Sequence, residues 1–173
     1  MRAKATLLVA VAGVFVFLLG GCGQGPRTPE AAVRQFMGPE SHPVFLGENV
    51  PLQGGQVVVF YKLSGSTAYA IVRRQSTGWR ELGSGAGFGS TADCAWAGAS
   101  RDGVTYIAGQ FSGTPLPYSV HVTAAHTFRT GLTENLSMHV PVDRHGFWAV
   151  RLPFSSGNVP IVGLTHQGTV RCN

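Results

Sequence analysis

The chain has 173 residues, a formal net charge of +5 and 24 glycines, and only 12% of its residues are charged. This length suits one domain or two small lobes that share a core. The basic residues are scattered, with Arg73 and Arg74 as the only adjacent pair, so the clustered basic footprint of a nucleic-acid-binding protein is missing and we expect no nucleic-acid partner.

Residues 1–21 have the features of a cleaved export signal. Arg2 and Lys4 are positively charged, and the 15 residues Ala5–Leu19 that follow them are apolar or small. A helix needs about 20 such residues to cross a hydrocarbon core of ~30 Å, so this segment is too short for a membrane span and has the size of a signal-peptide core. A plain secretory signal and a retained membrane helix are the alternatives.

The signal ends in Leu19-Gly20-Gly21-Cys22, which resembles the lipobox of bacterial lipoproteins. The resemblance implies that the chain is cleaved before Cys22 and that this cysteine is lipidated. It also implies an extracytoplasmic protein, anchored by lipid to the cell membrane or to the outer membrane of a cell with two. Residues 22–27 would form a short tether, and two or three acyl chains hold firmly because each buried CH₂ contributes about 0.8 kcal/mol.

One short helix is predicted over residues 28–37. Thr28 is a good N-cap, Pro29 suits the first helical position, and Glu30 faces the positive end of the helix dipole. Gly38 and the proline after it are expected to end the helix.

Everything after residue 50 has the pattern of strands and turns. β-branched and aromatic residues concentrate in 56–63 and 67–73, and 79–82 follows after a glycine turn, which predicts a meander. Glycine recurs through residues 83–91, where we expect a loop at a sheet corner. The later apolar or alternating segments are 94–96, 104–111, 118–123, 136–142, 147–152, 160–165 and 170–172.

These short strands, with turn signals every ~8–12 residues, predict an all-β protein. We expect an antiparallel β-sandwich, either Ig-like or a meander, preceded by one short N-terminal helix. On their strand pattern and on Gly146-Phe147-Trp148, residues 104–173 resemble the small Ig-like sandwich modules of secreted bacterial proteins, which implies a fold and no activity. The β-rich domain would span 28–173, as one body or as two lobes, 28–95 and 96–173.

The cysteines predict one disulfide bond. Once Cys22 is assigned to lipid, Cys94 and Cys172 remain as an even pair in an oxidising compartment. The loop that they would close stabilises a fold by up to ~4 kcal/mol on the chain-entropy model. Two unpaired buried thiols are the alternative.

Three histidine and tryptophan positions are candidate binding residues. His121 and His139 both fall on the polar side of their strands, so they could meet across a sheet as ligands of a metal or another group. The local spacings of metal sites are absent, however, which favours solvated strand positions and no metal or other cofactor. Trp79, between Gly78 and Arg80, is the candidate exposed aromatic, whereas Trp96 and Trp148 are expected in the core.

No catalytic motif occurs in the sequence. It contains no Gly-x-Ser-x-Gly or Ser-x-x-Lys, and the glycine-rich segment lacks the Gly-Lys-Ser/Thr of a phosphate loop. We therefore expect a non-enzymatic binding or accessory module of the cell envelope, which contacts the membrane through its lipid and an envelope protein or polymer of unknown identity. The alternatives are a small hydrolase of envelope polymers and an inhibitor or immunity-like protein, whose contact loop would be 83–91 or Pro115-Leu116-Pro117.

Overall fold

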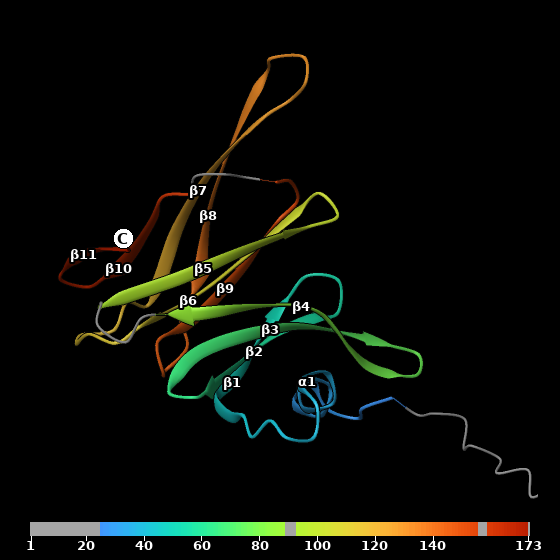
Figure 1. The fold of residues 1–173 in the computed structure, drawn as a ribbon. Coiled ribbons are helices and arrows are strands. Elements are labelled where there is room, and N and C mark those ends of the chain that lie inside the picture. The colour runs from blue at the N-terminus through green and yellow to red at the C-terminus, as the bar shows by residue number, and fades with distance from the viewer. Residues whose placement is uncertain (1–24, 89–92, 156–158, 173) are drawn as a thin grey trace, which may run out of the picture.

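The computed structural model describes residues 25–88, 93–155 and 159–172. Within these ranges one helix, α1 (Pro29–Met37), precedes antiparallel strands (Figure 1). The prediction of an all-β protein with one short N-terminal helix is confirmed. The strands are β1 (Val44–Leu52), β2 (Gln56–Leu63), β3 (Ser66–Gln75), β4 (Gly78–Phe88), β5 (Cys94–Arg101), β6 (Val104–Phe111), β7 (Ser119–Thr127), β8 (Thr133–Pro141), β9 (Phe147–Leu152), β10 (Ile161–Thr165) and β11 (Gly168–Cys172).

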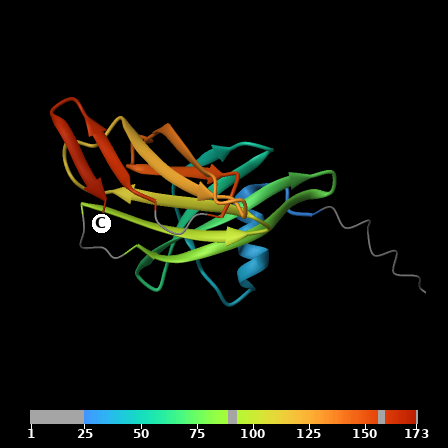
Figure 2. The same ribbon diagram turned by 90° about the horizontal axis from the view of Figure 1, so that it is seen from above.

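The strands form three sheets. The first sheet has the order β1-β2-β3-β4 and is a meander, the middle sheet has the order β5-β6-β9, and the outer sheet has the order β11-β10-β7-β8. The β7–β8 hairpin of the outer sheet projects away from the body, and α1 lies on the first sheet at the opposite side of the molecule (Figures 1 and 2). The sandwich therefore has one more sheet than a simple two-sheet design.

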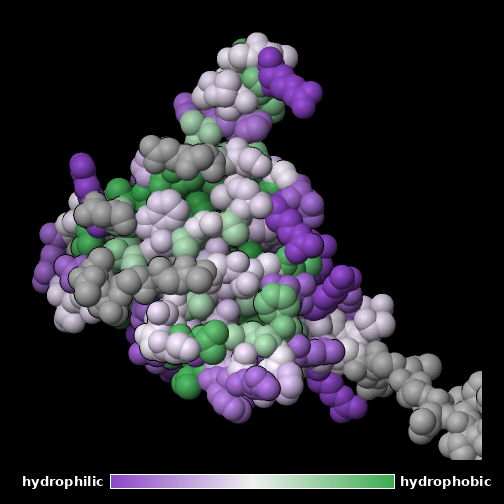
Figure 3. Space-filling view, in the orientation of Figure 1, coloured by the Kyte–Doolittle hydropathy of each residue, from purple (hydrophilic) through white to green (hydrophobic). Residues whose placement is uncertain are grey.

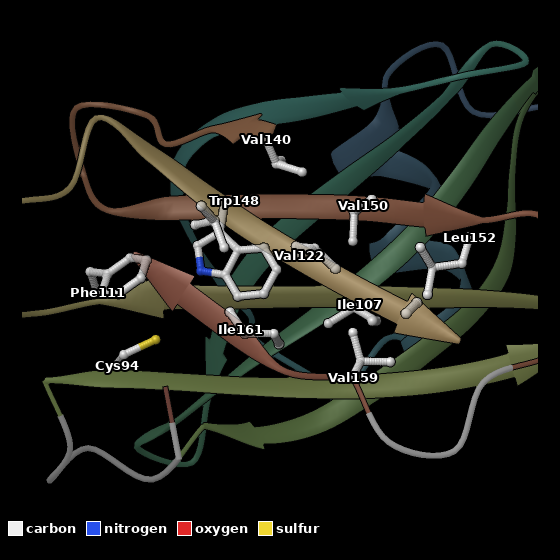
Figure 4. Close-up of a cluster of buried hydrophobic side chains, with 12 residues drawn as sticks. Cys94, Ile107, Phe111, Val122, Val140, Trp148, Val150, Leu152, Val159 and Ile161 are labelled. Carbon is white, nitrogen blue, oxygen red and sulfur yellow. The ribbon is translucent and has the colours of Figure 1, made fainter. Parts of the chain in front are cut away.

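The middle sheet is buried on both faces. On one face its side chains Tyr106, Ala108, Phe147 and Ala149 pack against β2 and β3 of the first sheet. On the other face its side chains pack against the outer sheet, and Figure 4 shows Trp148, Val150 and Leu152 pointing toward Val122 and Ile161. Because neighbouring residues of a strand point to opposite faces, β6 and β9 consist almost entirely of buried residues.

The predicted helix begins and ends where its capping residues indicate. The Thr28 hydroxyl accepts a hydrogen bond of 3.1 Å from the backbone N–H of Ala31, and the Gly38 N–H donates to the Arg34 carbonyl. Ala32 and Val33 are buried against β2 and β3, so the first sheet is also covered on both faces. In addition, the Asn49 amide of β1 donates to the Glu30 carboxylate at 2.5 Å, which ties the first turn of α1 to the edge of the sheet.

Strand β1 was not predicted. Gly47 and Pro51 interrupt its apolar pattern, and its pairing with β2 shifts register between Leu46 and Val50. Gly47 has a φ of +61°, a conformation that side chains rarely adopt, so it suits the bulge at this position. β1 is also an edge strand, where a proline is tolerated.

The prediction of a glycine loop at a sheet corner is wrong for the part of 83–91 that the structure describes. Residues 83–88 continue β4 and pair with β3, while 89–91 lie outside the described residues. A Cβ atom at Gly85 would overlap the ring of Tyr69, which is fully buried on β3. Glycine is therefore placed in this strand because an aromatic ring lies over its backbone.

Candidate functional site

The structure brings His121 and His139 together, as the alternation of their strands predicted. They are direct partners in the β7–β8 pairing, and their rings are stacked with centroids 4.9 Å apart. His121 Nε2 also shares a hydrogen bond of 2.6 Å with the Ser137 hydroxyl. The pair lies on the face of the outer sheet that points away from the core.

The two imidazoles alone supply too few ligands for a metal centre. In the part of the chain that the structure describes, no group of three or more His, Cys, Asp or Glu side chains lies close enough to hold a metal ion. Protein sites for zinc supply three or four such ligands. The histidine pair thus offers two stacked polar rings on an open surface.

Cys94 and Cys172 form the predicted pair. Their sulfur atoms lie at disulfide distance, 1.94 Å apart, and the two residues are separated by 78 positions in the sequence. The bond joins β5, at the edge of the middle sheet, to β11, at the edge of the outer sheet. Both cysteines contact the buried cluster between these two sheets, which contains Trp148.

Trp79 is half-buried and stands beside the N-terminal end of the described chain. It is the second residue of β4, and its side chain packs against the buried cluster beneath α1. Its backbone N–H donates to the Pro26 carbonyl at 2.8 Å, and the Gly25 N–H donates to the Thr77 carbonyl. The candidate aromatic is therefore partly exposed and held rigidly.

A groove of about 370 Å³ surrounds the exposed part of Trp79. Helix α1 and β4 supply most of the lining residues, and the last residue of β5 supplies one more. The lining side chains are Ala32, Gln35, Phe36, Trp79, Arg80, Glu81 and Arg101. We take this Trp79 groove as the candidate functional site.

The groove combines aromatic surface with a mixed charge. Phe36 is 57% exposed although it belongs to the apolar side of α1, so it offers a second aromatic ring to a ligand. Arg80 and Arg101 supply guanidinium groups, which donate several hydrogen bonds in a fixed plane. Among the described residues, Glu81 is the only acid that lines the groove.

Glu81 has an unusual environment for a carboxylate. Burial raises its pKa above the ordinary value of 4.5, and the nearby charge of Arg101 acts in the opposite direction. Its Oε1 atom is buried and has no hydrogen-bond partner among the described residues. The wall of the groove therefore contains a partly desolvated carboxyl group that faces the charge of Arg101.

Sequence reasoning identified Trp79 and missed the residues around it. Phe36, Glu81 and Arg101 come from three elements that the fold brings together, and no local spacing links them. One feature of the sequence could have indicated the groove. The helix α1 carries more apolar residues than the two that it buries, and Phe36 is one that stays exposed.

A second cavity, of about 270 Å³, lies beside the loop Pro115-Leu116-Pro117 and the β10–β11 hairpin. Asp93 and several threonines contribute polar groups to it, and Leu116 at its side is 37% exposed. This is the proline loop that the sequence suggested as a contact surface.

Comparisons with protein-family models, with curated proteins and with solved structures gave no match. The Ig-like resemblance therefore stays a prediction, as does the lipoprotein assignment. Within the described residues, α1 is much too short to cross a membrane, and no other helix could do so.

The raised pKa of Glu81 predicts a pH-dependent stability. The folded chain holds this proton more tightly than the unfolded chain, so the favourable contribution is complete below about pH 4.5 and is lost as the pH rises through the folded-state pKa. Glu81→Gln does not titrate and so does not lose stability in this way. We expect the free energy of unfolding of the variant, relative to that of the parent, to be higher at neutral pH than at acid pH. Urea unfolding at the two pH values measures this difference.

Glu134→Gln, which removes an exposed carboxylate from β8, is the matched control for the loss of one charge. A difference between Glu81→Gln and the parent that is the same at both pH values would contradict the assigned environment of Glu81.

Proposed function

We propose that the chain is a lipid-anchored extracytoplasmic protein that acts as a non-enzymatic binding module of the cell envelope. The leader and Cys22 support the anchor, since they resemble the export signal and lipobox of bacterial lipoproteins. The Cys94–Cys172 pair supports export, because disulfides persist in oxidising compartments outside the cytoplasm.

The composition of the Trp79 groove is the observation that carries the binding role. Two aromatic rings offer flat apolar surface, and two guanidinium groups offer charged donors. Hydrolysis of a glycosidic polymer needs a pair of carboxyl groups, whereas Glu81 is the single acid lining the groove among the described residues. The groove is better equipped to hold an envelope protein or polymer than to cleave one.

The groove also lies close to the proposed anchor. Gly25 and Pro26 are hydrogen-bonded to the β3–β4 turn beside Trp79. Only two residues lie between Cys22 and Gly25, so the two Cα atoms are three steps apart along the chain and at most ~11 Å apart in space. A lipid on Cys22 would hold the groove near the membrane surface, where it can meet ligands that are themselves close to the membrane.

The β7–β8 hairpin favours a second candidate, an inhibitor or immunity-like role. At its projecting end Phe128 is 44% and Leu132 is 70% exposed, and Figure 3 shows hydrophobic and hydrophilic atoms side by side there. Exposed apolar groups on a protruding loop are typical of a contact with another protein.

The anchor is tested by Cys22→Ala. We expect the variant to be released from membranes, because it cannot carry the acyl chains that supply the membrane affinity. The measurement is the share of protein in the membrane pellet after cell fractionation. Serine at the same position should release it equally, and a Cys22→Ala chain that stays in the pellet would contradict the proposal.

The released Cys22→Ala protein allows a direct test of the groove by cosedimentation with envelopes from cells that lack the chain. We expect Trp79→Ala to weaken binding at least tenfold, which corresponds to about 1.4 kcal/mol, because it removes the main stacking surface. Arg80→Gln should weaken binding as well without touching the packing beneath α1, since Arg80 is exposed.

Tyr118→Ala is the matched control, because Tyr118 is an aromatic residue 53% exposed on a different part of the surface. Protease treatment of the envelopes separates a protein ligand from a polymer. Full binding by both groove variants, or an equal loss in Tyr118→Ala, would contradict the groove as the binding site.

A further inference from the structure

A smaller cavity, of about 140 Å³, lies where the first and middle sheets part, on the other side of Arg101 from the Trp79 groove. Three arginines from three strands line it: Arg73 of β3, Arg101 of β5 and Arg151 of β9. Tyr106 and two apolar side chains complete most of its wall. We call this the arginine cavity.

The fold forces Arg151 toward this cavity. Phe147, Ala149 and Arg151 alternate along β9 and point toward the first sheet, and the first two belong to the buried cluster between the sheets. Arg151 ends this inward row. Its Nε atom is buried and has no hydrogen-bond partner among the described residues.

Arg73 is held in place by a buried amide. Gln56 of β2 is only 2% exposed and is the direct neighbour of Arg73 in the β2–β3 pairing. With its amide oxygen turned toward Arg73, Gln56 accepts hydrogen bonds from Nε at 3.2 Å and from Nη2 at 2.5 Å. Gln56 thus orients the guanidinium of Arg73, an exposed residue, without neutralising its charge.

The acids nearby do not balance the three arginines. Among the described residues, Asp102 is the only acid that lines the arginine cavity. Its side chain is 91% exposed and reaches Arg101 at 3.7 Å, the long end of an ion pair. Glu81, on the groove side, also faces the charge of Arg101. Arg73 and Arg151 therefore give the arginine cavity a net positive charge.

A buried guanidinium nitrogen without a partner is costly, and an anion bound to the same guanidinium would offset that cost. The planar fork of arginine matches the oxygens of carboxylate and phosphate groups, and several arginines together favour an anion with more than two oxygens. A cavity of ~150 Å³ holds a group the size of benzene, so 140 Å³ is enough for a tetrahedral anion.

We propose that the arginine cavity binds a small oxyanion of the phosphate class. The anion is either free phosphate or the phosphoryl group of a lipid headgroup, since both present the same oxygens to Arg73, Arg101 and Arg151. This site is separate from the proposed ligand site at Trp79, although Arg101 borders both.

The test is calorimetric titration of the Cys22→Ala protein with inorganic phosphate at constant ionic strength, with chloride as the reference anion. We expect saturable binding of one phosphate per chain that Arg151→Gln weakens at least tenfold. Arg151→Lys should restore part of the affinity, because it keeps the charge and loses the fork. Arg129→Gln, an exposed arginine at the end of the β7–β8 hairpin, should bind like the parent.

Folding of the variants is followed by thermal unfolding in phosphate-free buffer. Arg151→Gln should be at least as stable as the parent there, since it removes an unpartnered buried group. Phosphate should raise the melting temperature of the parent and of Arg129→Gln, and should not raise that of Arg151→Gln. Arg73→Gln, on the opposite wall, gives a second measure of affinity if Arg151→Gln does not fold.

Vesicles of phosphatidylglycerol, with phosphatidylcholine vesicles as the reference, separate the two sources of the anion. Binding to phosphatidylglycerol that depends on Arg151, without a response to inorganic phosphate, would support the headgroup source. The absence of binding to both probes would overturn the proposal, as would equal phosphate affinity in the parent and in both Arg151→Gln and Arg73→Gln.

Discussion

The pairing of β6 with β9 is the contact on which the other layers depend. β6 is the central strand of the middle sheet and β9 is one of its edge strands, and each presents buried side chains on both faces. Small residues make this arrangement possible. Gly109 lies directly under the ring of Trp148, where an added Cβ would come within 2.5 Å of ring atoms, and Ala108 and Ala149 face the first sheet.

The position of the candidate sites follows from this layering. Alternate side chains of β5 and of β9 face the first sheet, and these two rows end in Arg101 and Arg151. Arg101 lines both the Trp79 groove and the arginine cavity, so a ligand bound in one would change the electrostatic environment of the other. The Cys94–Cys172 bond acts at the opposite end of β5, where it fixes the edges of the middle and outer sheets.

Local patterns were sufficient for the elements whose signals lie within a few residues. The caps of α1, the alternation that brings His121 to His139, and the even pair of cysteines were all readable from the sequence. The third sheet was not, because a short continuous apolar run is consistent with a buried strand and does not show which sheets cover its two faces. Phe147 and Ala149 lie on the face of β9 opposite to Trp148, and only the fold shows that the first sheet covers them.

The candidate groove depends on contacts that no spacing reveals. Trp79 was identifiable because glycine and arginine flank it, whereas Glu81 and Arg101 acquire their roles only when β4 and the end of β5 meet α1. The same holds for Gly85. Its neighbours suggested a loop, and the ring of Tyr69 from the adjacent strand explains why the strand continues.

Urea unfolding of two variants, at neighbouring residues of β6, tests most directly whether the middle sheet is buried on both faces. Ala108→Leu and Gly109→Ala each add volume, the first toward the first sheet and the second beneath Trp148. Both should lower the free energy of unfolding by about 1–3 kcal/mol. Gly83→Ala, at a glycine of β4 with open space around it, should change it by less than about 0.5 kcal/mol. A neutral effect at either Ala108 or Gly109 would contradict a middle sheet packed on both sides.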